Sequence, residues 1–308
     1  MAALHRLLCV FGNRNVLFLG SIALGIVAGD WAVYTRPWTL PALALAMALS
    51  STQVENRAFH PLSKLLRPAL VSAFLSFAVE GAAILIPARL LVPERALWPG
   101  FVMAAAAPPA AAMVAFTDIA GGDITFSLLG MVGSYLASMV VTPAMVLLLA
   151  GEAGVDPLSV GRLVLQLVLI PLLTSRLILA SPLKESVTRW RGRIANWAVA
   201  LVLFTSTGLN REAFLGEPRL VLLIALVNVI RTFGLAIAID AVMRLRHCAS
   251  ETRISYVLMA TLKNSGFAAA TALALLGERA AIPSGVAAVV GVLYLVWSGM
   301  RWGSQDAV

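Results

Sequence analysis

The sequence has few of the residues on which catalytic and disulfide-bonded soluble proteins depend. Its 308 residues include two cysteines, three histidines and only 12% charged residues. Cys9 and Cys248 provide neither a disulfide framework nor the spacing of a metal site. No nucleophile is spaced from a base as catalysis requires, and no metal-binding cluster occurs. We therefore expect a protein that is not an enzyme and that holds no cofactor.

Low polarity and a positive charge balance define the class of protein. Hydrophobic residues make up 60% of the chain, and the mean hydropathy is +0.91. These values are typical of a polytopic helical membrane protein, whose main partner is the lipid bilayer. The net charge of +8 does not indicate nucleic-acid binding, because no basic cluster is interleaved with aromatic residues. The sequence says nothing of protein partners.

Ten apolar segments follow one another with short connections. We place them at residues 15–33, 38–53, 66–86, 97–116, 124–149, 158–179, 194–209, 220–243, 254–276 and 282–302. No linker is long enough to separate soluble domains, so residues 1–308 are expected to form a single transmembrane domain. Lys and Arg are about twice as frequent on the face that holds both termini. By the positive-inside rule, both termini should be cytoplasmic.

The ninth segment is interrupted at its middle by the residues T-L-K-N-S-G-F, at positions 261–267. Lys263 lies near the midpoint of the span, where a bare charge costs at least ~2.5–3.5 kcal/mol. The three residues that follow favour leaving the helix: Asn264, Ser265 and Gly266. A helix broken at membrane depth is tolerated only where the freed backbone faces protein or a water-filled cavity. This stretch therefore predicts the lining of a polar site.

The fourth segment has a matching interruption. Pro108 and Pro109 remove two backbone donors where the helix should continue. Pro109 and Ser265 are 156 residues apart, close to half of the chain. Broken helices in corresponding places are typical of inverted-repeat transporters, which predicts one repeat over residues 1–153 and another over 154–308. The alternative is a proline kink in the fourth segment and a tolerated polar patch in the ninth.

Three stretches carry a resemblance to a known family: the Pro108 region, V-V-T-P-A-M-V-L-L-L-A-G-E at 140–152, and K-N-S-G at 263–266. In these the chain resembles the bile acid:sodium symporter family, ten-helix secondary transporters of bile acids and other organic anions. The resemblance implies a panel domain (segments 1, 2, 6 and 7) and a core domain (3–5 and 8–10) in which helices four and nine cross. It also implies a bacterial inner-membrane protein whose substrate binds beside that crossing, at Pro108, Pro109, Thr117, Asn264, Ser265 and Gly266.

The sodium sites of the family are altered in this sequence. Relatives use a glutamate, glutamines, hydroxyl and amide side chains and backbone carbonyls as ligands. The corresponding positions here are Met259 for the glutamate, Lys263 and Ser76 for the glutamines, and Met113, Val114 and Met131 for the smaller polar residues. Only Ser127 keeps a ligand oxygen. Because hard cations need oxygen ligands, we do not expect sodium coupling of the family type.

Glu80 is the one acidic residue deep in the third segment, one helical turn from Ser76. We hypothesise that Lys263 takes the vacated cation position and is neutralised by Glu80; alternatively Glu80 lies nearer the interface or faces Arg231. If Lys263 gains and loses a proton, transport would be proton-coupled. If it stays charged, the protein is a facilitator or exchanger.

The expected function is thus sodium-independent transport of a small organic anion, bile-acid-like or another carboxylate, by alternating access. A non-transporting membrane sensor is the alternative. A sodium/proton antiporter would need a carboxylate deep in the fifth segment, and residues 124–149 contain none.

Overall fold

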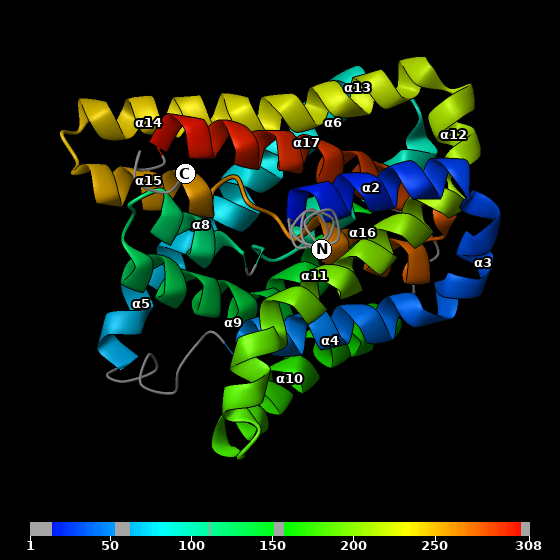
Figure 1. Ribbon diagram of the computed structural model, residues 1–308. Helices are drawn as coiled ribbons and strands as arrows, with labels where there is room; N and C mark the ends of the chain where they lie inside the picture. The colour runs from blue at the N-terminus through cyan, green and yellow to red at the C-terminus, as the bar shows by residue number, and fades with distance from the viewer. Residues whose placement is uncertain (1–13, 53–61, 111, 151–156, 303–308) are drawn as a thin grey trace, which may run out of the picture.

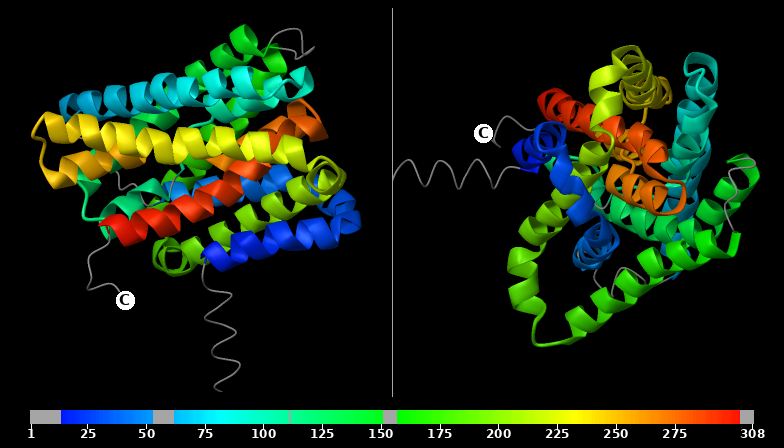
Figure 2. Two further views of the ribbon diagram at one scale, coloured as in Figure 1. Left: turned by 90° about the horizontal axis from the view of Figure 1, so that it is seen from above. Right: turned by 90° about the vertical axis from the view of Figure 1, so that its right-hand side faces the viewer.

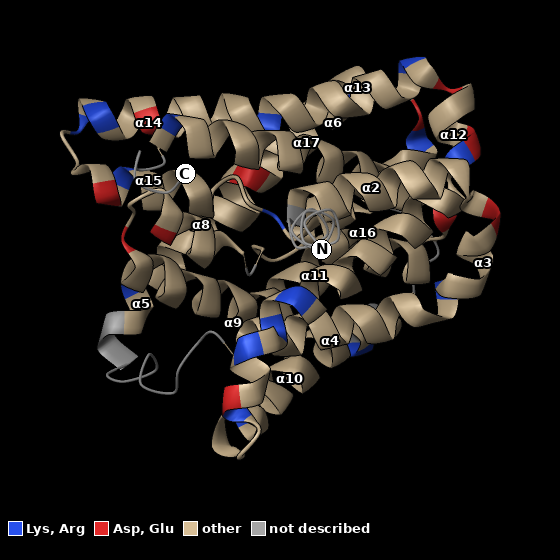
Figure 3. Ribbon diagram, viewed as in Figure 1, with Lys and Arg blue, Asp and Glu red and all other residues tan. Residues whose placement is uncertain are grey.

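A computed structural model describes residues 14–52, 62–110, 112–150 and 157–302, and every regular element in these ranges is a helix (Figure 1). The long helices run side by side, as the view from above shows (Figure 2). The all-α prediction is therefore confirmed. Basic residues gather on the first turns of α11 (Lys184–Leu209), in the lower part of the bundle in this view (Figure 3).

Four helices in the described ranges are long and apolar enough to cross a membrane. They match the third, fifth, eighth and tenth expected segments: Leu65–Leu91, α9 (Ile124–Leu149), Pro218–Leu245 and α17 (Glu278–Trp302). The helix pair Asn15–Val27 and Gly29–Ser51, bent by 94°, would be a fifth membrane span if the two helices cross as one unit. Of the remaining expected segments, the fourth and the ninth are interrupted, and Leu165–Ala180 and Ser265–Leu275 are shorter apolar helices.

Two of these spans contain a π-helical stretch. Leu65–Leu91 consists of α5 (Leu62–Ala73), η4 (Phe74–Glu80) and α6 (Gly81–Leu91). Pro218–Leu245 consists of α13 (Pro218–Val229), η6 (Ile230–Gly234) and α14 (Leu235–Leu245). The π-helical stretches η4 and η6 begin 156 residues apart, the interval that also separates Pro109 from Ser265. Such stretches inside long helices frequently mark functional sites.

One group of helices packs around α11. Its other members are α2 (Arg14–Val27), α4 (Thr39–Ser51) and α10 (Pro157–Ala180). A Cβ on Gly25 would lie 2.8 Å from the carbonyl oxygen of Phe204, so glycine is what lets α2 approach α11 this closely. The short elements η1 (Gly29–Trp31), α3 (Ala32–Thr35) and η2 (Arg36–Trp38) join α2 to α4, and α12 (Arg211–Gly216) follows α11. We call α2, α4, α10 and α11 the outer group.

Both expected helix breaks are present. After η5 (Arg95–Leu97), α7 (Trp98–Ala106) ends before the two prolines and α8 (Met113–Ile119) begins beyond them. In the ninth segment, α15 (Ser250–Met259) ends before the polar stretch and α16 (Ser265–Leu275) begins within it. The sequence therefore located both breaks correctly.

Candidate functional site at the two helix breaks

The two broken helices meet through their main chains. Ala110 N donates a hydrogen bond to Leu262 O at 2.7 Å, and Asn264 N donates one to Pro108 O at 3.0 Å. Pro109 and Lys263 form an isolated antiparallel bridge between these two bonds. Backbone groups freed by a break in a membrane helix must find partners inside the protein. Here each break supplies partners for the other, and we call residues 107–110 and 260–264 together the crossing.

The residue after Lys263 restarts the helix. The side-chain oxygen Oδ1 of Asn264 accepts a hydrogen bond from Phe267 N at 3.0 Å, so Asn264 is the N-cap of α16. Asp123 caps α9 in the same way, through a 2.9 Å bond from Phe126 N. Asn264, predicted to contact substrate, therefore also has a structural role.

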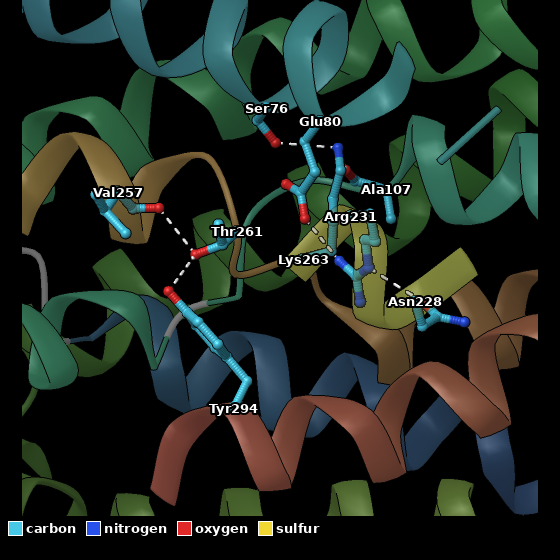
Figure 4. Close-up of polar contacts among 9 residues, drawn as sticks. All are labelled: Ser76, Glu80, Ala107, Asn228, Arg231, Val257, Thr261, Lys263 and Tyr294. Carbon is cyan, nitrogen blue, oxygen red and sulfur yellow. Dashed lines mark hydrogen bonds and ion pairs between the residues drawn. The ribbon is translucent and has the colours of Figure 1, made fainter. Parts of the chain in front are cut away.

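Lys263 is bound at the end of a helix. Its ammonium Nζ donates to Ala107 O at 2.7 Å and to Ser76 Oγ at 3.0 Å (Figure 4). It also lies 4.7 Å from the ring centroid of Phe77, within the range of a cation–π interaction. Ala107 is the C-cap of α7, where unpaired carbonyls carry partial negative charge. The ammonium group therefore compensates the partial negative charge at the buried C-terminal end of α7.

Glu80 forms its ion pair with Arg231. Its Oε1 accepts a hydrogen bond from Arg231 Nη1 at 2.6 Å, and the two side chains are 0% and 4% exposed. Arg231 Nε also donates to Asn228 Oδ1 at 3.2 Å. The hypothesis of a Glu80–Lys263 pair is thus replaced by its alternative, although all three charges lie close together (Figure 4). The pair joins η4 to η6, the two π-helical stretches.

Three methionines at the expected sodium-ligand positions are fully buried: Met113, Met131 and Met259. A Cβ on Gly130 would lie 2.5 Å from Met259 Cε, so the glycine leaves the space that this methionine fills. Val114 is buried as well. Thioether and valine side chains offer none of the hard oxygen ligands that such a cation needs.

The hydroxyl of Ser127 is engaged within the protein. Thr117 Oγ1, which lies 2.9 Å from Met113 O, also lies 3.1 Å from Ser127 Oγ. Both hydroxyls are fully buried, and Thr117 does not line the pocket described below. Within the described ranges, no group of three or more His, Cys, Asp or Glu side chains could hold a metal ion.

A pocket of about 160 Å³ lies between the outer group and the crossing. Its walls are mainly apolar, with Leu43 and Met47 from α4 and Leu203 from α11. Polar and charged residues also contribute to the lining: Arg231, Thr261, Lys263, Asn264 and Ser265. The pocket is therefore amphipathic, with two basic residues beside the crossing.

Of the residues predicted to contact substrate, the structure brings Asn264, Ser265 and Gly266 to the pocket. Pro108 and Pro109 lie in the crossing, where Pro108 contributes its backbone carbonyl. Sequence reasoning missed Tyr135, which lines the pocket, and whose hydroxyl has no partner among the described residues. The available signal was the single tyrosine in the fifth segment.

A second missed residue is Tyr294. Its hydroxyl shares a 2.9 Å hydrogen bond with Thr261 Oγ1, which donates to Val257 O at 2.8 Å (Figure 4). This contact ties α17 to the break between α15 and α16. The signal in the sequence was again a single tyrosine in an apolar run.

Comparison with known families gives a match over most of the chain. The model of the SBF-like CPA transporter family (DUF4137) covers residues 46–297, which include both helix breaks as well as Glu80, Arg231 and Lys263. The match confirms the resemblance to the bile acid:sodium symporter family that the sequence motifs indicated. No functionally curated protein matches the chain.

Proposed function

Because the chain belongs to the SBF-like CPA transporter family, we propose that this integral membrane protein is a secondary transporter that moves a small organic anion by alternating access. The observation that carries the proposal is the amphipathic pocket with Arg231 and Lys263 in its lining. Apolar walls suit the carbon skeleton of such a solute, and the basic residues suit its carboxylate.

The charge balance at the crossing supports an anion. Arg231 and Lys263 line the pocket, whereas Glu80, the acid nearest to them, does not. With all three ionised, the group carries one net positive charge at membrane depth. Such a charge is costly in a bilayer unless it has a partner, and a bound carboxylate supplies one.

The size of the pocket favours a short solute. A volume of about 160 Å³ is below the ~300–1,000 Å³ typical of pockets for drug-sized ligands. We therefore place short carboxylates ahead of steroids among the organic anions that the family resemblance suggests.

The side chains at the expected ion sites support independence from sodium. Buried methionines stand where relatives have polar ligands, and Lys263 Nζ already donates a hydrogen bond to the carbonyl oxygen of Ala107. We infer that the lysine serves as a fixed internal cation. This arrangement would keep the crossing intact in every step of the cycle without a dissolved ion.

The expected repeats offer a route for alternating access. The two helix breaks and the two π-helical stretches recur at similar intervals in the two halves, which supports ten helices in two inverted repeats. The outer group would then move against the helices of the crossing. The ion pair Arg36–Glu278, 2.7 Å long, joins η2, in the connection from α2 to α4, to the first residue of α17, and it would have to open if these elements separate.

A membrane sensor that binds the anion without moving it is the second candidate, favoured by the filled ion sites. The test uses purified full-length protein, first in a thermal-shift assay with short 2-keto acids and with taurocholate, in NaCl or in KCl. We expect stabilisation by a short acid in both salts. Uptake of the same labelled acid into proteoliposomes then separates the candidates: binding without uptake supports a sensor, and uptake that requires sodium refutes the proposed mechanism.

A further inference from the structure

A second basic site lies away from the crossing, where α14, α15 and α17 come together at the end of the bundle that holds the C-terminus of α17. A hollow of about 610 Å³ is lined by three arginines, Arg244, Arg253 and Arg301, together with Ser250 and Trp302. The turn after α8 closes it with Ala120 and Gly121. None of these residues lines the pocket beside the crossing.

All three arginines form ion pairs with one buried carboxylate. Asp240, whose side chain is 4% exposed, lies 3.0 Å from Arg244 Nε, 3.2 Å from Arg253 Nε and 3.2 Å from Arg301 Nη2. The cluster therefore has an excess of two positive charges. Because Asp240 is buried beneath the arginines, the exposed parts of the guanidinium groups remain available to a ligand.

Several hydrogen-bond donors at this hollow are unused. Each guanidinium has five N–H groups, and Asp240 receives a hydrogen bond from only one nitrogen of Arg244 and one of Arg301. Arg253 Nε forms its 3.2 Å ion pair with Asp240 without hydrogen-bond geometry, and Trp302 Nε1 has no hydrogen-bond acceptor among the described residues. Ser250 is the first residue of α15, so backbone N–H groups of a helix start also lie here.

Forked guanidinium donors beside a helix N-terminus match the oxygens of a phosphate group. We propose that the hollow lined by Arg244, Arg253 and Arg301 binds an anionic phosphate, supplied either by the headgroup of an acidic phospholipid or by a phosphate in solution. Two tryptophans lie against the cluster: the guanidinium carbon of Arg301 is 5.3 Å from the ring centroid of Trp297 and 5.6 Å from that of Trp302. Tryptophans are enriched at headgroup level, which makes a lipid an accessible source.

The position of the site connects it to the transport pathway. A phosphate held here would contact the first turn of α15, and α15 leads directly from Ser250 to Met259, the residue before the crossing. Binding would also hold the ends of α14, α15 and α17 together. The ligand is therefore expected to stabilise the half of the broken helix that precedes Lys263.

The experiment uses full-length protein in a neutral detergent. Dioleoyl phosphatidylglycerol, dioleoyl phosphatidylcholine and inorganic phosphate are titrated separately while the melting temperature is followed. The test variant is Arg244→Gln, because Arg244 is the most exposed of the three arginines and Asp240 keeps two partners without it. The matched control is Arg246→Gln, which removes the same charge two residues away from an exposed position outside the hollow.

We expect phosphatidylglycerol or inorganic phosphate to raise the melting temperature, and Arg244→Gln to weaken that effect about tenfold in ligand concentration, the loss of one charge-assisted hydrogen bond. A response to phosphatidylglycerol alone identifies a lipid headgroup, and a response to inorganic phosphate identifies a soluble ligand. The proposal is wrong if neither ligand acts more strongly than phosphatidylcholine, or if Arg246→Gln weakens binding as much as Arg244→Gln does.

Discussion

Removing one partner of the buried Glu80–Arg231 ion pair should lower the free energy of unfolding strongly. The two groups are 2.6 Å apart and almost fully buried, so Glu80→Leu leaves a buried guanidinium without its counter-charge. Breaking a buried pair on one side typically costs ~3–5 kcal/mol. At about 2–4 °C per kcal/mol, this predicts a fall in melting temperature on the order of 10 °C.

The double variant Glu80→Leu/Arg231→Met should recover most of this loss. Both charges are then gone, and apolar replacement of a buried pair is often neutral or stabilising by ~1–4 kcal/mol. The assay is equilibrium unfolding of purified protein in mixed micelles, analysed as a double-mutant cycle. A coupling energy of at least ~2 kcal/mol is expected.

The matched control is the ion pair Arg36–Glu278. It has nearly the same length, 2.7 Å, but its side chains are 49% and 43% exposed. Exposed pairs contribute ~0–1 kcal/mol, so Glu278→Leu should change stability little. The reasoning fails if Glu80→Leu costs no more than this control, or if the losses from the two single variants at Glu80 and Arg231 simply add.

Three further perturbations test the binding site, the packing beside it and the ion pair Glu217–Arg279. Lys263→Met should abolish stabilisation by short carboxylates in the thermal-shift assay. This variant should still unfold at a higher temperature than Glu80→Leu, because Glu80 keeps its ion pair with Arg231. Unchanged anion binding would show that Lys263 does not contact the ligand. Gly130→Ala should destabilise by ~1–3 kcal/mol, since the new Cβ would meet Met259 Cε at 2.5 Å and Ser72 Cβ at 2.9 Å; an unaffected melting temperature would contradict the close packing. The hydrogen bonds from Arg279 hold the pKa of Glu217 below its ordinary value of 4.5, so the contact stabilises the fold above that pH and is lost as the pH falls through the lowered value. Between pH 7 and pH 3 the melting temperature should therefore fall more steeply for the native chain than for Glu217→Gln. Parallel pH dependences would refute the linkage.

The breaks could be located from the sequence because their causes are local. Pro108 and Pro109 lack the donors that a helix needs, and Asn264 is a strong capping residue immediately after a buried lysine. Each effect acts within a few residues of its origin. The same holds for the apolar spans, whose length and composition are properties of one segment.

The partner of Glu80 could not be chosen in the same way. Arg231 is 151 residues away, and its position depends on how two spans pack. The α-helical periodicity places Ser76 and Glu80 on one face, yet these residues lie in the π-helical stretch η4, where the extra residue in a turn alters their relative directions. As a result, Ser76 meets Lys263 while Glu80 meets Arg231.

The direction of the Thr117 side chain could not be predicted, for a related reason. Its hydroxyl could face either the pocket or the helix that follows, and the rotation of α8 after the break turns it toward Ser127. The residues of the crossing are thus placed by local chemistry, whereas side-chain directions depend on the packing of distant helices.

The main-chain bonds between Ala110 and Leu262 and between Asn264 and Pro108 have a consequence for how this architecture can diversify. Nearly all amino acids carry the same backbone amide and carbonyl groups, so a contact made from these groups persists while the side chains beside it are exchanged. A lineage can therefore give up one coupling chemistry and acquire another without first dismantling its scaffold. For protein engineers, residues lining the cavity are accordingly open to redesign toward new cargo, provided that the two peptides keep their antiparallel contact.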